Sequence, residues 1–409
     1  MKSSTVVVAV MCVVLCAQAQ VMYAQRFFDE VFSEVDVTRD IKYGNALDYV
    51  GVSTDLVLDV YAPVGDTRPL RPLIIMVHGG GFTGGGKAGE SMQTWGTDLA
   101  KRGFVAVSIE YRLGTTSKLE AKPMWEASLR AGQDVRASVR FMRSMAVTYG
   151  IDTSMIFLVG TSAGGFAIMQ ASVLQDDEIP AYVDPAVGTA EGTSGTPGVS
   201  SRVHALVVCW GAVTDTMNID AGDPPIIAIH GTDDKTVPYL CGPSKFGFEL
   251  CGAVPLTNRA QNLGIYNAMQ LFEGAGHTLD GNAVLLDSCF TFFADELAGL
   301  VDDSATTSVN EYSNAPNTNN SNSVQGNGAL LAVYPNPATS ASIIVVSGAS
   351  GYATLRIVDI MGRVVAQPFV GTVSGELRIP LPTLPAGSYY VVLHAEQGRT
   401  AYTHGLIVH

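Results

Sequence analysis

A serine between two glycines is the feature of this sequence that points most directly to chemistry. Residues Gly160–Gly164 have the pattern G-x-S-x-G with Ser162 at the centre, and they follow an apolar run, Met155–Val159. In this context the pattern predicts a tight strand-to-helix turn at a strained backbone angle, whose glycines leave room for the chain to bend and for a substrate to approach. Ser162 is therefore the candidate nucleophile.

Two later segments offer the partners that a nucleophilic serine needs. His277 ends a glycine-rich loop after a predicted strand, where an imidazole is placed to take the serine proton as general base. The segment His230–Pro238 holds two carboxylates, and one of them can orient that imidazole and stabilise its charged form. We favour Asp234, four residues before the proline, over Asp233, which more often caps such a loop.

A glycine run supplies candidate donors for a developing negative charge. Residues His78–Phe82 read His-Gly-Gly-Gly-Phe and follow the apolar run Leu73–Val77. Amides in such a run can point into a site without obstruction by side chains, which suits an oxyanion hole. We expect the donors to be Gly80 and Gly81, completed by Ala163, the residue after the nucleophile.

An alternation of strands and helices must position these residues. Apolar runs predict strands at Val57–Tyr61, Leu73–Val77, Val105–Ile109, Met155–Val159, Ala205–Cys209, Ile226–His230 and Met269–Phe272. Amphipathic segments predict helices at Ser91–Arg102, Trp125–Tyr149, Gly164–Leu174 and Ala283–Leu297. The expected fold class is α/β, with a mostly parallel sheet that carries helices on both faces.

Composition narrows the classes of function. The chain has 409 residues, of which 47% are hydrophobic and 15% charged, and its formal net charge is -14. Such a charge repels phosphate backbones and disfavours a nucleic-acid partner. No stretch reaches the length of a transmembrane helix, and no zinc-spaced cluster or phosphate-cradling motif is present, so we expect no metal and no cofactor.

The two ends of the chain differ from its middle. Residues 1–19 combine Lys2, a short apolar run and a small-x-small site, which predicts a secretory signal peptide. Residues 20–300 form the predicted catalytic domain. Residues 301–328 are rich in Asn, Ser and Thr and predict a linker. Residues 329–409 contain short alternating runs and turns, which predict a small all-β sandwich.

Four cysteines remain after the predicted signal peptide, an even number that favours disulfides in an exported protein. Cys241 and Cys251 bracket a loop that a disulfide can close. Cys209 lies in an apolar run and can equally be a buried free thiol, and the absence of any disulfide stays open as an alternative.

Residues 55–300 resemble α/β-hydrolases of the carboxylesterase type, similar to hormone-sensitive-lipase-like and bacterial feruloyl-esterase-like enzymes. The resemblance rests on the segments described above, on Tyr111–Leu113, and on the chain order Ser162, Asp234, His277. It implies a serine esterase with Ser162 as nucleophile, His277 as base and Asp234 as its orienting acid. It also implies a supporting role for Tyr111 and Arg112.

The C-terminal segment resembles the sorting domain of the type IX secretion system of Bacteroidetes. The resemblance rests on Tyr334–Ala338, Asp359–Val364 and Leu384–Tyr389, in that order, although the chain ends in His409 rather than lysine. It implies the type IX secretion machinery as a partner, export through the outer membrane, and release or attachment at the cell surface. A carbohydrate-binding sandwich is the alternative, disfavoured because the tail holds no tryptophan.

Substrate identity stays open among several esters and one peptide class. A short-chain carboxylesterase is our first hypothesis, an acetyl or feruloyl esterase acting on polysaccharide the second, and a serine exopeptidase the third. A surface binding protein that keeps a hydrolase fold without using it is the non-enzymatic alternative. The segments Gln175–Arg202 and Arg26–Phe32 are candidate lid and cap, or plain surface loops.

Overall fold

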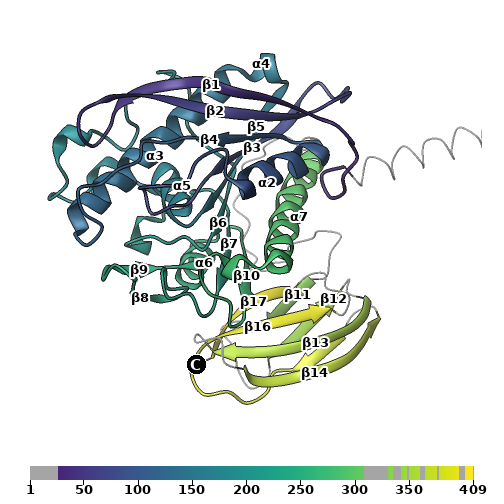
Figure 1. Cartoon of the computed structure of the whole chain (residues 1–409). Helices are drawn as coiled ribbons and strands as arrows, with labels where there is room; N and C mark the ends of the chain where they lie inside the picture. Colours follow the sequence, from purple (N-terminus) through teal and green to yellow (C-terminus); the bar gives the residue numbers. More distant parts are fainter. Residues whose placement is uncertain are drawn as a thin grey trace, which may run out of the picture.

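The larger part of the molecule is built around one extended sheet. The computed structural model describes residues 26–307 and, towards the C-terminus, residues 330–334, 342–347, 350–359, 364–374, 377–395 and 401–408. Within residues 26–307 an eight-stranded sheet has the order β1-β2-β4-β3-β5-β6-β7-β10 (Figure 1). The predicted signal peptide, residues 1–19, lies outside the described residues.

The sheet is antiparallel at one edge and parallel elsewhere. The pairs β1–β2 and β2–β4 are antiparallel, and the five remaining pairs are parallel. The strands are β1 (Val35–Leu47), β2 (Ser53–Pro63), β3 (Arg71–Val77), β4 (Val105–Ile109), β5 (Ile151–Thr161), β6 (Ala205–Cys209), β7 (Ile226–Gly231) and β10 (Asn267–Phe272). The predicted mostly parallel sheet is confirmed.

Helices cover both faces of the sheet, and the alternation of side chains along β3 shows why. Leu73, Ile75 and Val77 belong to one buried cluster, shared with α3 (Ala121–Ser144) and α5 (Ala163–Val173). Ile74 and Met76 belong to the other, shared with α2 (Glu90–Lys101) and α7 (Ala283–Thr307). A strand buried on both faces needs apolar residues at consecutive positions, which is the pattern that predicted it.

Helix α7 extends beyond the predicted domain boundary. It continues to Thr307, whereas the prediction ended the catalytic domain at residue 300. Val301 is buried in the same cluster as Phe293 and Leu297, so packing continues past that boundary. The rest of the predicted linker, residues 308–328, lies outside the described residues.

Shorter elements join the sheet and its helices. They are the helices α4 (Ala146–Tyr149) and α6 (Ala253–Asn262), the strands β8 (Cys241–Pro243) and β9 (Glu249–Cys251), and the 3-10 turns η1 (Asp176–Glu178), η2 (Pro185–Val187), η3 (Thr216–Asn218) and η4 (His277–Gly281). The strands β8 and β9 pair with each other as a separate antiparallel hairpin.

The C-terminal part forms two small antiparallel sheets, as predicted. One has the order β11-β12-β15 and the other β14-β13-β16-β17. Their bounds are β11 (Leu330–Tyr334), β12 (Ile343–Ser347), β13 (Ser350–Asp359), β14 (Val364–Ser374), β15 (Leu377–Pro380), β16 (Gly387–Ala395) and β17 (Ala401–Val408). Buried residues of both sheets, such as Ile344 and Leu355, share one apolar cluster, which is how a sandwich is held together.

Two of the tail segments on which the sorting-domain resemblance rests, Tyr334–Ala338 and Asp359–Val364, lie partly outside the described residues. The third, Leu384–Tyr389, is described, and there the Tyr389 hydroxyl donates to the carbonyl of Pro385 at 2.9 Å. Among the helices that the structure describes, none has the length and apolar character needed to cross a membrane.

Candidate active site

Ser162 lies at a sharp turn between β5 and α5. Its backbone has φ 52° and ψ -118°, a conformation that non-glycine residues rarely adopt and that costs about 1–3 kcal/mol. Both glycines of the pattern are required by close packing. A Cβ on Gly160 would lie 2.3 Å from the carbonyl oxygen of Gly164, and one on Gly164 would lie 2.1 Å from that of Val77. The turn therefore holds the serine hydroxyl at the carboxyl edge of the sheet.

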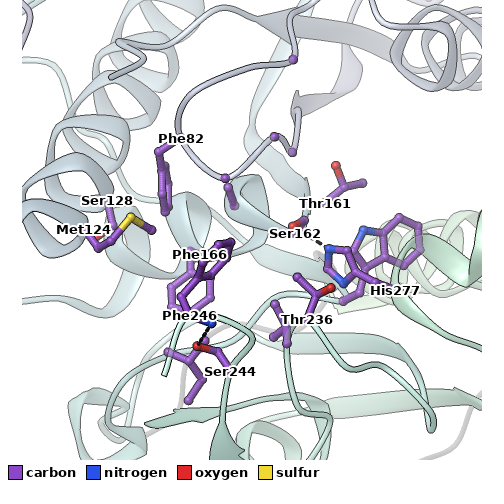
Figure 2. Close-up of a pocket in the computed structure, with 18 of the residues that line it drawn as sticks. Phe82, Met124, Ser128, Thr161, Ser162, Phe166, Thr236, Ser244, Phe246 and His277 are labelled. Carbon is purple, nitrogen blue, oxygen red and sulfur yellow. Dashed lines mark hydrogen bonds between the residues drawn. The ribbon is translucent and has the colours of Figure 1, made fainter. Parts of the chain in front are cut away.

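An unbroken line of hydrogen bonds joins three side chains at that edge. Ser162 Oγ lies 2.9 Å from Nε2 of His277, and Nδ1 of the same imidazole lies 2.7 Å from Oδ2 of Asp234 (Figure 2 shows the first contact). Since an ionised carboxylate only accepts, Nδ1 carries the proton and Nε2 is free to accept from the serine. This is the arrangement in which an imidazole acts as base toward a hydroxyl.

The two aspartates of the loop after β7 have different surroundings. The Asp234 side chain is fully buried and faces His277, whereas the Asp233 side chain is 58% exposed and pairs with Lys235. Asp233 is tied into the loop through its backbone, since its amide donates to the carbonyl of Ala275 at 2.9 Å. The structure thus places Asp234, and not Asp233, against the imidazole.

Polar groups around Asp234 favour its charged form. Its Oδ1 accepts the amides of Thr236 at 2.8 Å and Val237 at 2.9 Å, and its Oδ2 lies 3.2 Å from Nε2 of His230. Burial alone would raise the pKa of Asp234, but the hydrogen bonds from His230, His277 and the Val237 amide hold it well below its usual range. His230 is fully buried and contacts the carboxylate directly.

His277 is fixed by an unusual turn. The three residues that follow it, Thr278, Leu279 and Asp280, all have left-handed backbone angles, with φ between 51° and 57°. Leu279 is buried in the core, and the Asp280 carboxylate accepts the amide of Gly276 at 2.7 Å. The burial of Leu279 and the contact between Asp280 and Gly276 hold this strained turn, and with it His277, in place.

The glycine run after β3 passes beside the nucleophile. A Cβ on Gly79 would lie 3.1 Å from Cβ of Ser162, and Gly80 and Gly81 have φ of 119° and 61°. Within the described part of the chain no acceptor is recorded for the amides of Gly80 and Gly81. Ala163 is the first residue of α5, where amides have no partner in the helix. All three amides are therefore free to donate.

Ser162 and His277 line a large cavity of about 1040 Å³, and Asp234 is buried behind them. Sequence reasoning missed the residues of its walls, because they come from separate segments: Phe82, Met124, Trp125, Phe166, Trp210, Phe246 and Phe248. Most are aromatic, and Figure 2 shows Phe82, Phe166 and Phe246 on the opposite side of Ser162 from His277. Trp210 has a positive φ of 41°, a backbone signal that appears only in the structure.

The candidate lid and cap segments differ in their relation to the cavity. Pro180 and Tyr182, within Gln175–Arg202, line it. The segment Arg26–Phe32 packs elsewhere: Phe27 is buried against Phe104, with ring centroids 4.8 Å apart. Of these two segments, only the first contributes to the wall.

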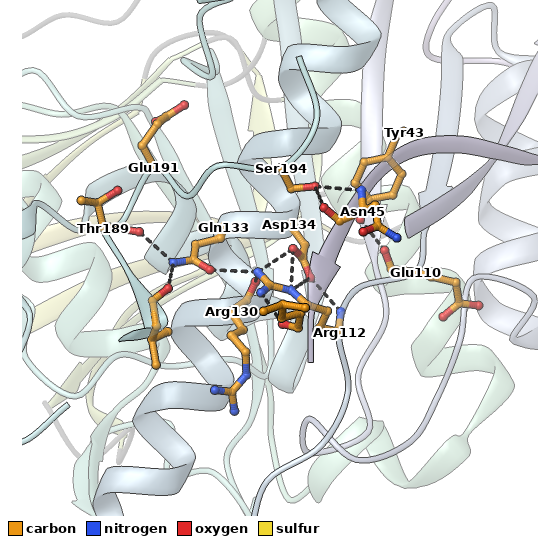
Figure 3. Close-up of polar contacts among 12 residues, drawn as sticks. Tyr43, Asn45, Glu110, Arg112, Arg130, Gln133, Asp134, Thr189, Glu191 and Ser194 are labelled. Carbon is orange, nitrogen blue, oxygen red and sulfur yellow. Dashed lines mark hydrogen bonds and ion pairs between the residues drawn. The ribbon is translucent and has the colours of Figure 1, made fainter. Parts of the chain in front are cut away.

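Tyr111 and Arg112 hold the scaffold behind the site, as the resemblance implied. The Tyr111 hydroxyl donates to the carbonyl of His78 at 3.0 Å, at the start of the glycine run. Arg112 forms a buried ion pair with Asp134 at 2.8 Å and donates to Gln133 at 2.8 Å (Figure 3). The two contacts of Arg112 connect the segment after β4 to α3.

Two cysteines are joined and two are free in the described structure. Cys241 and Cys251, the pair predicted as a possible disulfide, are bonded across the hairpin of β8 and β9. Cys209 and Cys289 are buried free thiols. No cluster of three or more potential metal ligands occurs among the residues that the structure describes.

Family models match two parts of the chain. Residues 58–217 match the model described as BD-FAE, and residues 332–409 match that of the secretion system C-terminal sorting domain. The central part of this chain is thus similar to the BD-FAE family. The match to that domain includes Ser162 and the glycine run but ends before Asp234 and His277. Both family resemblances inferred from the sequence are confirmed.

Curated relatives of the chain include several esterases. Carboxylesterase 3B of Mus musculus is 30% identical over 115 residues, which cover 28% of this chain and 19% of the relative. Neuroligin-like protein glit-1 of Caenorhabditis elegans is 31% identical over 116 residues, which cover 28% of this chain and 15% of the relative. Esterase LipC of Mycobacterium tuberculosis is 25% identical over 197 residues, which cover 42% of this chain and 46% of the relative. The chain spans less than half the length of each of these relatives.

Solved structures similar to the chain include two esterases. An esterase of the Planctomycetes species Thermogutta terrifontis is 23% identical, with a TM-score of 0.47, over 61% of this chain and 90% of the other. A truncated carbohydrate esterase from gut microbiota is 23% identical, with a TM-score of 0.48, over 66% and 98%. At these scores neither superposition bears on the chemistry of the site.

Proposed function

We propose that this protein is an exported serine esterase that hydrolyses carboxylic esters through an acyl-enzyme. The observation that supports it best is the line of hydrogen bonds from Ser162 Oγ through His277 to Asp234, at 2.9 and 2.7 Å, which opens into a large cavity. A surface protein that merely kept the fold would have no need of a serine, a histidine and an aspartate joined by hydrogen bonds in this order.

In the first step Ser162 Oγ attacks the ester carbonyl while Nε2 of His277 takes its proton. Asp234, held in its charged form, stabilises the imidazolium that results. The carbonyl oxygen becomes negative and lies against the free amides of Gly80, Gly81 and Ala163. His277 then gives its proton to the leaving alkoxide, the C–O bond breaks, and the acyl group stays on Ser162.

The second step repeats the first with water in place of the serine. His277 takes a proton from a water molecule as its oxygen attacks the acyl carbonyl, and the same three amides stabilise the negative oxygen. Collapse of this intermediate returns the proton to Ser162 Oγ and releases the carboxylic acid. Neither step requires an electron acceptor or a further reactant.

The names of the relatives favour esters over peptides, since carboxylesterase and esterase recur among them. No feature of the described residues favours the exopeptidase. An acetyl or feruloyl ester on polysaccharide stays a narrower prediction within the esterase proposal.

The deciding experiment compares two serines of the same cavity. Ser162→Ala should lower hydrolysis of p-nitrophenyl acetate by about 10⁵–10⁶-fold and abolish labelling by a fluorophosphonate. Ser128→Ala is the matched control, because its hydroxyl donates to the Trp125 carbonyl on α3 and has no contact with His277. Wild-type rates in the Ser162→Ala protein, or label on another residue, would overturn the proposal.

The C-terminal sorting domain supports export through the type IX secretion machinery. We expect the mature enzyme in the culture medium or at the surface of the producing cell, with the signal peptide and the tail removed. Mass spectrometry of these fractions tests this, and recovery of the full-length chain from the cytoplasm alone would contradict it.

A further inference from the structure

The wall of the cavity includes a hairpin that is closed by a disulfide. It spans residues 241–251 and is called the rim hairpin here: β8 and β9 pair in antiparallel register, and Cys241 lies opposite Cys251, to which it is bonded. Cys241 is exposed at the surface, so a reductant in solution can reach this bond. The two buried cysteines, Cys209 and Cys289, do not share that access.

The tip of the rim hairpin is internally ordered. The Ser244 hydroxyl oxygen accepts the amides of Phe246 at 3.3 Å and Phe248 at 3.2 Å, and the Ser244 amide donates to the carbonyl of Phe248 at 2.7 Å. Such side-chain contacts to nearby amides stabilise a tight turn. They fix the backbone that carries Phe246 and Phe248.

Backbone hydrogen bonds tie both the base and the tip of the rim hairpin to the elements that carry the active site. Cys251 and Val213, which follows β6, exchange two backbone hydrogen bonds of 2.8 and 3.0 Å. The Lys245 amide donates to the carbonyl of Thr236 at 3.0 Å, and the Thr236 amide donates in turn to Asp234. The hairpin is thus anchored beside the orienting carboxylate.

The aromatic residues of the hairpin face the part of the cavity that an acyl group must occupy. The imidazole that protonates the leaving alkoxide marks the alcohol side of Ser162, and the three amides fix the carbonyl oxygen. The acyl chain is left with the remaining direction. In Figure 2, Phe82, Phe166 and Phe246 lie on that side, across Ser162 from His277.

We propose that the rim hairpin is the element that selects bulky apolar acyl groups, and that its disulfide sets this selectivity. The inference rests on the proposed esterase function and adds to it a structural origin of acyl preference. With the disulfide closed, Phe246 and Phe248 complete an apolar wall beside Phe166. With it open, the tip loses a covalent constraint and the wall loses its shape, while Ser162, Asp234 and His277 keep their contacts.

The first test removes the disulfide and measures kcat/KM for two esters. The double variant Cys241→Ser/Cys251→Ser should lose about tenfold in kcat/KM for p-nitrophenyl octanoate, since apolar pocket contacts discriminate by about 10–200-fold. Its kcat/KM for p-nitrophenyl acetate should change less than about twofold. A phosphine reductant, which donates two electrons to the disulfide and is itself oxidised, should reproduce this loss in the wild type and have no effect on the double variant.

The second test leaves the backbone and the disulfide untouched. Phe246→Ala should lower kcat/KM for the octanoate several-fold more than that for the acetate, so that the octanoate-to-acetate ratio falls. Phe32→Ala is the matched control, because it is a half-buried phenylalanine outside the cavity wall. It should leave the octanoate-to-acetate ratio unchanged.

The outcomes separate this inference from the proposed function. If the wild type hydrolyses neither ester, the esterase proposal fails. If it hydrolyses the acetate and the ratio is the same in wild type, double variant and Phe246→Ala, the rim hairpin does not select the acyl group and only this inference is overturned.

Discussion

The floor and the rim of the cavity are built in different ways. The floor consists of Ser162 and His277 with Asp234 buried behind them, and each of the three follows a parallel strand of the large sheet. The rim consists of residues 175–202, which side-chain hydrogen bonds from Gln133 tie to α3, and of the rim hairpin. Backbone hydrogen bonds to Val213 and Thr236 anchor the hairpin, and a disulfide closes it on itself. The floor is fixed by backbone packed too closely to shift, whereas the rim depends on a few identifiable contacts.

This difference separates chemistry from selectivity. Glycine contacts such as that between Gly164 and Val77 leave no space for a side chain, so a change at the floor disturbs the reacting atoms. A change at the rim alters the space around the substrate while the hydrogen bonds of the floor remain. Changes at the floor should therefore affect all esters, and changes at the rim mainly the bulky ones.

The largest effect that tests this division is expected at the carboxylate. Asp234→Asn should lower kcat by about 10⁴-fold for acetate and octanoate esters alike, because an amide cannot hold the imidazole in the required tautomer. Asp233→Asn is the matched control, and it should stay within about twofold because its side chain pairs only with Lys235 at the surface. Steady-state kinetics of both variants check this, and the reverse order would move the acid by one position.

The next effect concerns the glycine run. A Cβ on Gly80 would lie 2.0 Å from the carbonyl oxygen of Gly84, whereas one on Gly81 would meet only Nζ of Lys118, at 3.7 Å. Gly80→Ala should therefore displace the loop and lower kcat by about 10²–10³-fold, the usual cost of a lost oxyanion donor. Gly81→Ala, strained only by its positive φ, should cost less. Equal losses in the two variants would show that strain, and not the clash, sets the rate.

A third prediction uses pH to test how much the negative charge of Asp234 contributes to the stability of the fold. The pKa of Asp234 is lower in the folded protein than the value of about 3.9 of an unfolded chain. The charge of Asp234 therefore stabilises the fold above that value, and this stabilisation is lost as pH falls through the folded-state pKa. The free energy of unfolding of wild type should exceed that of Asp234→Asn by less at pH 3 than at pH 7. Urea denaturation at both pH values measures it, and a constant difference would contradict it.

Much of the sheet could be predicted from the sequence, because its strands are buried on both faces. Two strands, β4 (Val105–Ile109) and β6 (Ala205–Cys209), have the predicted bounds. The edge strand β1 was missed because polar residues interrupt its apolar positions, so that it contains no continuous apolar run. Helix α6 was missed as well: its first turn contains Pro255, and Thr257 and Asn258 follow, so its sequence carries a weak helical signal.

The floor could also be predicted, since each member carries a local signal: glycines and a preceding apolar run. The rim could not. Phe82, Phe166 and Phe246 are separated by about 80 residues each and meet only through the fold, and a lone phenylalanine in a sequence gives no sign of facing a cavity. Selectivity therefore depends on information that becomes visible only in three dimensions.

The smallest effect is expected where the other half of the rim is tied to the scaffold. The Gln133 amide on α3 donates to the carbonyls of Val187 at 2.9 Å and Thr189 at 2.8 Å, and its oxygen accepts from Arg112 (Figure 3). Gln133→Leu keeps the volume but removes three hydrogen bonds, one of them to the buried Arg112, which should cost about 1–3 kcal/mol in the free energy of unfolding.

The loss should appear first as local opening of residues 175–202, detected as faster amide hydrogen exchange in that segment. It should raise KM for the octanoate a few-fold and leave kcat for the acetate unchanged, because Tyr182 belongs to the wall and not to the floor. Gln175→Ala, which removes only an exposed hydrogen bond of 3.1 Å to Asp220, is the control within the same segment. If Gln133→Leu instead lowered kcat for both esters, floor and rim would be one mechanical unit, since loosening the rim would then move the hydrogen-bonded line from Ser162 to Asp234.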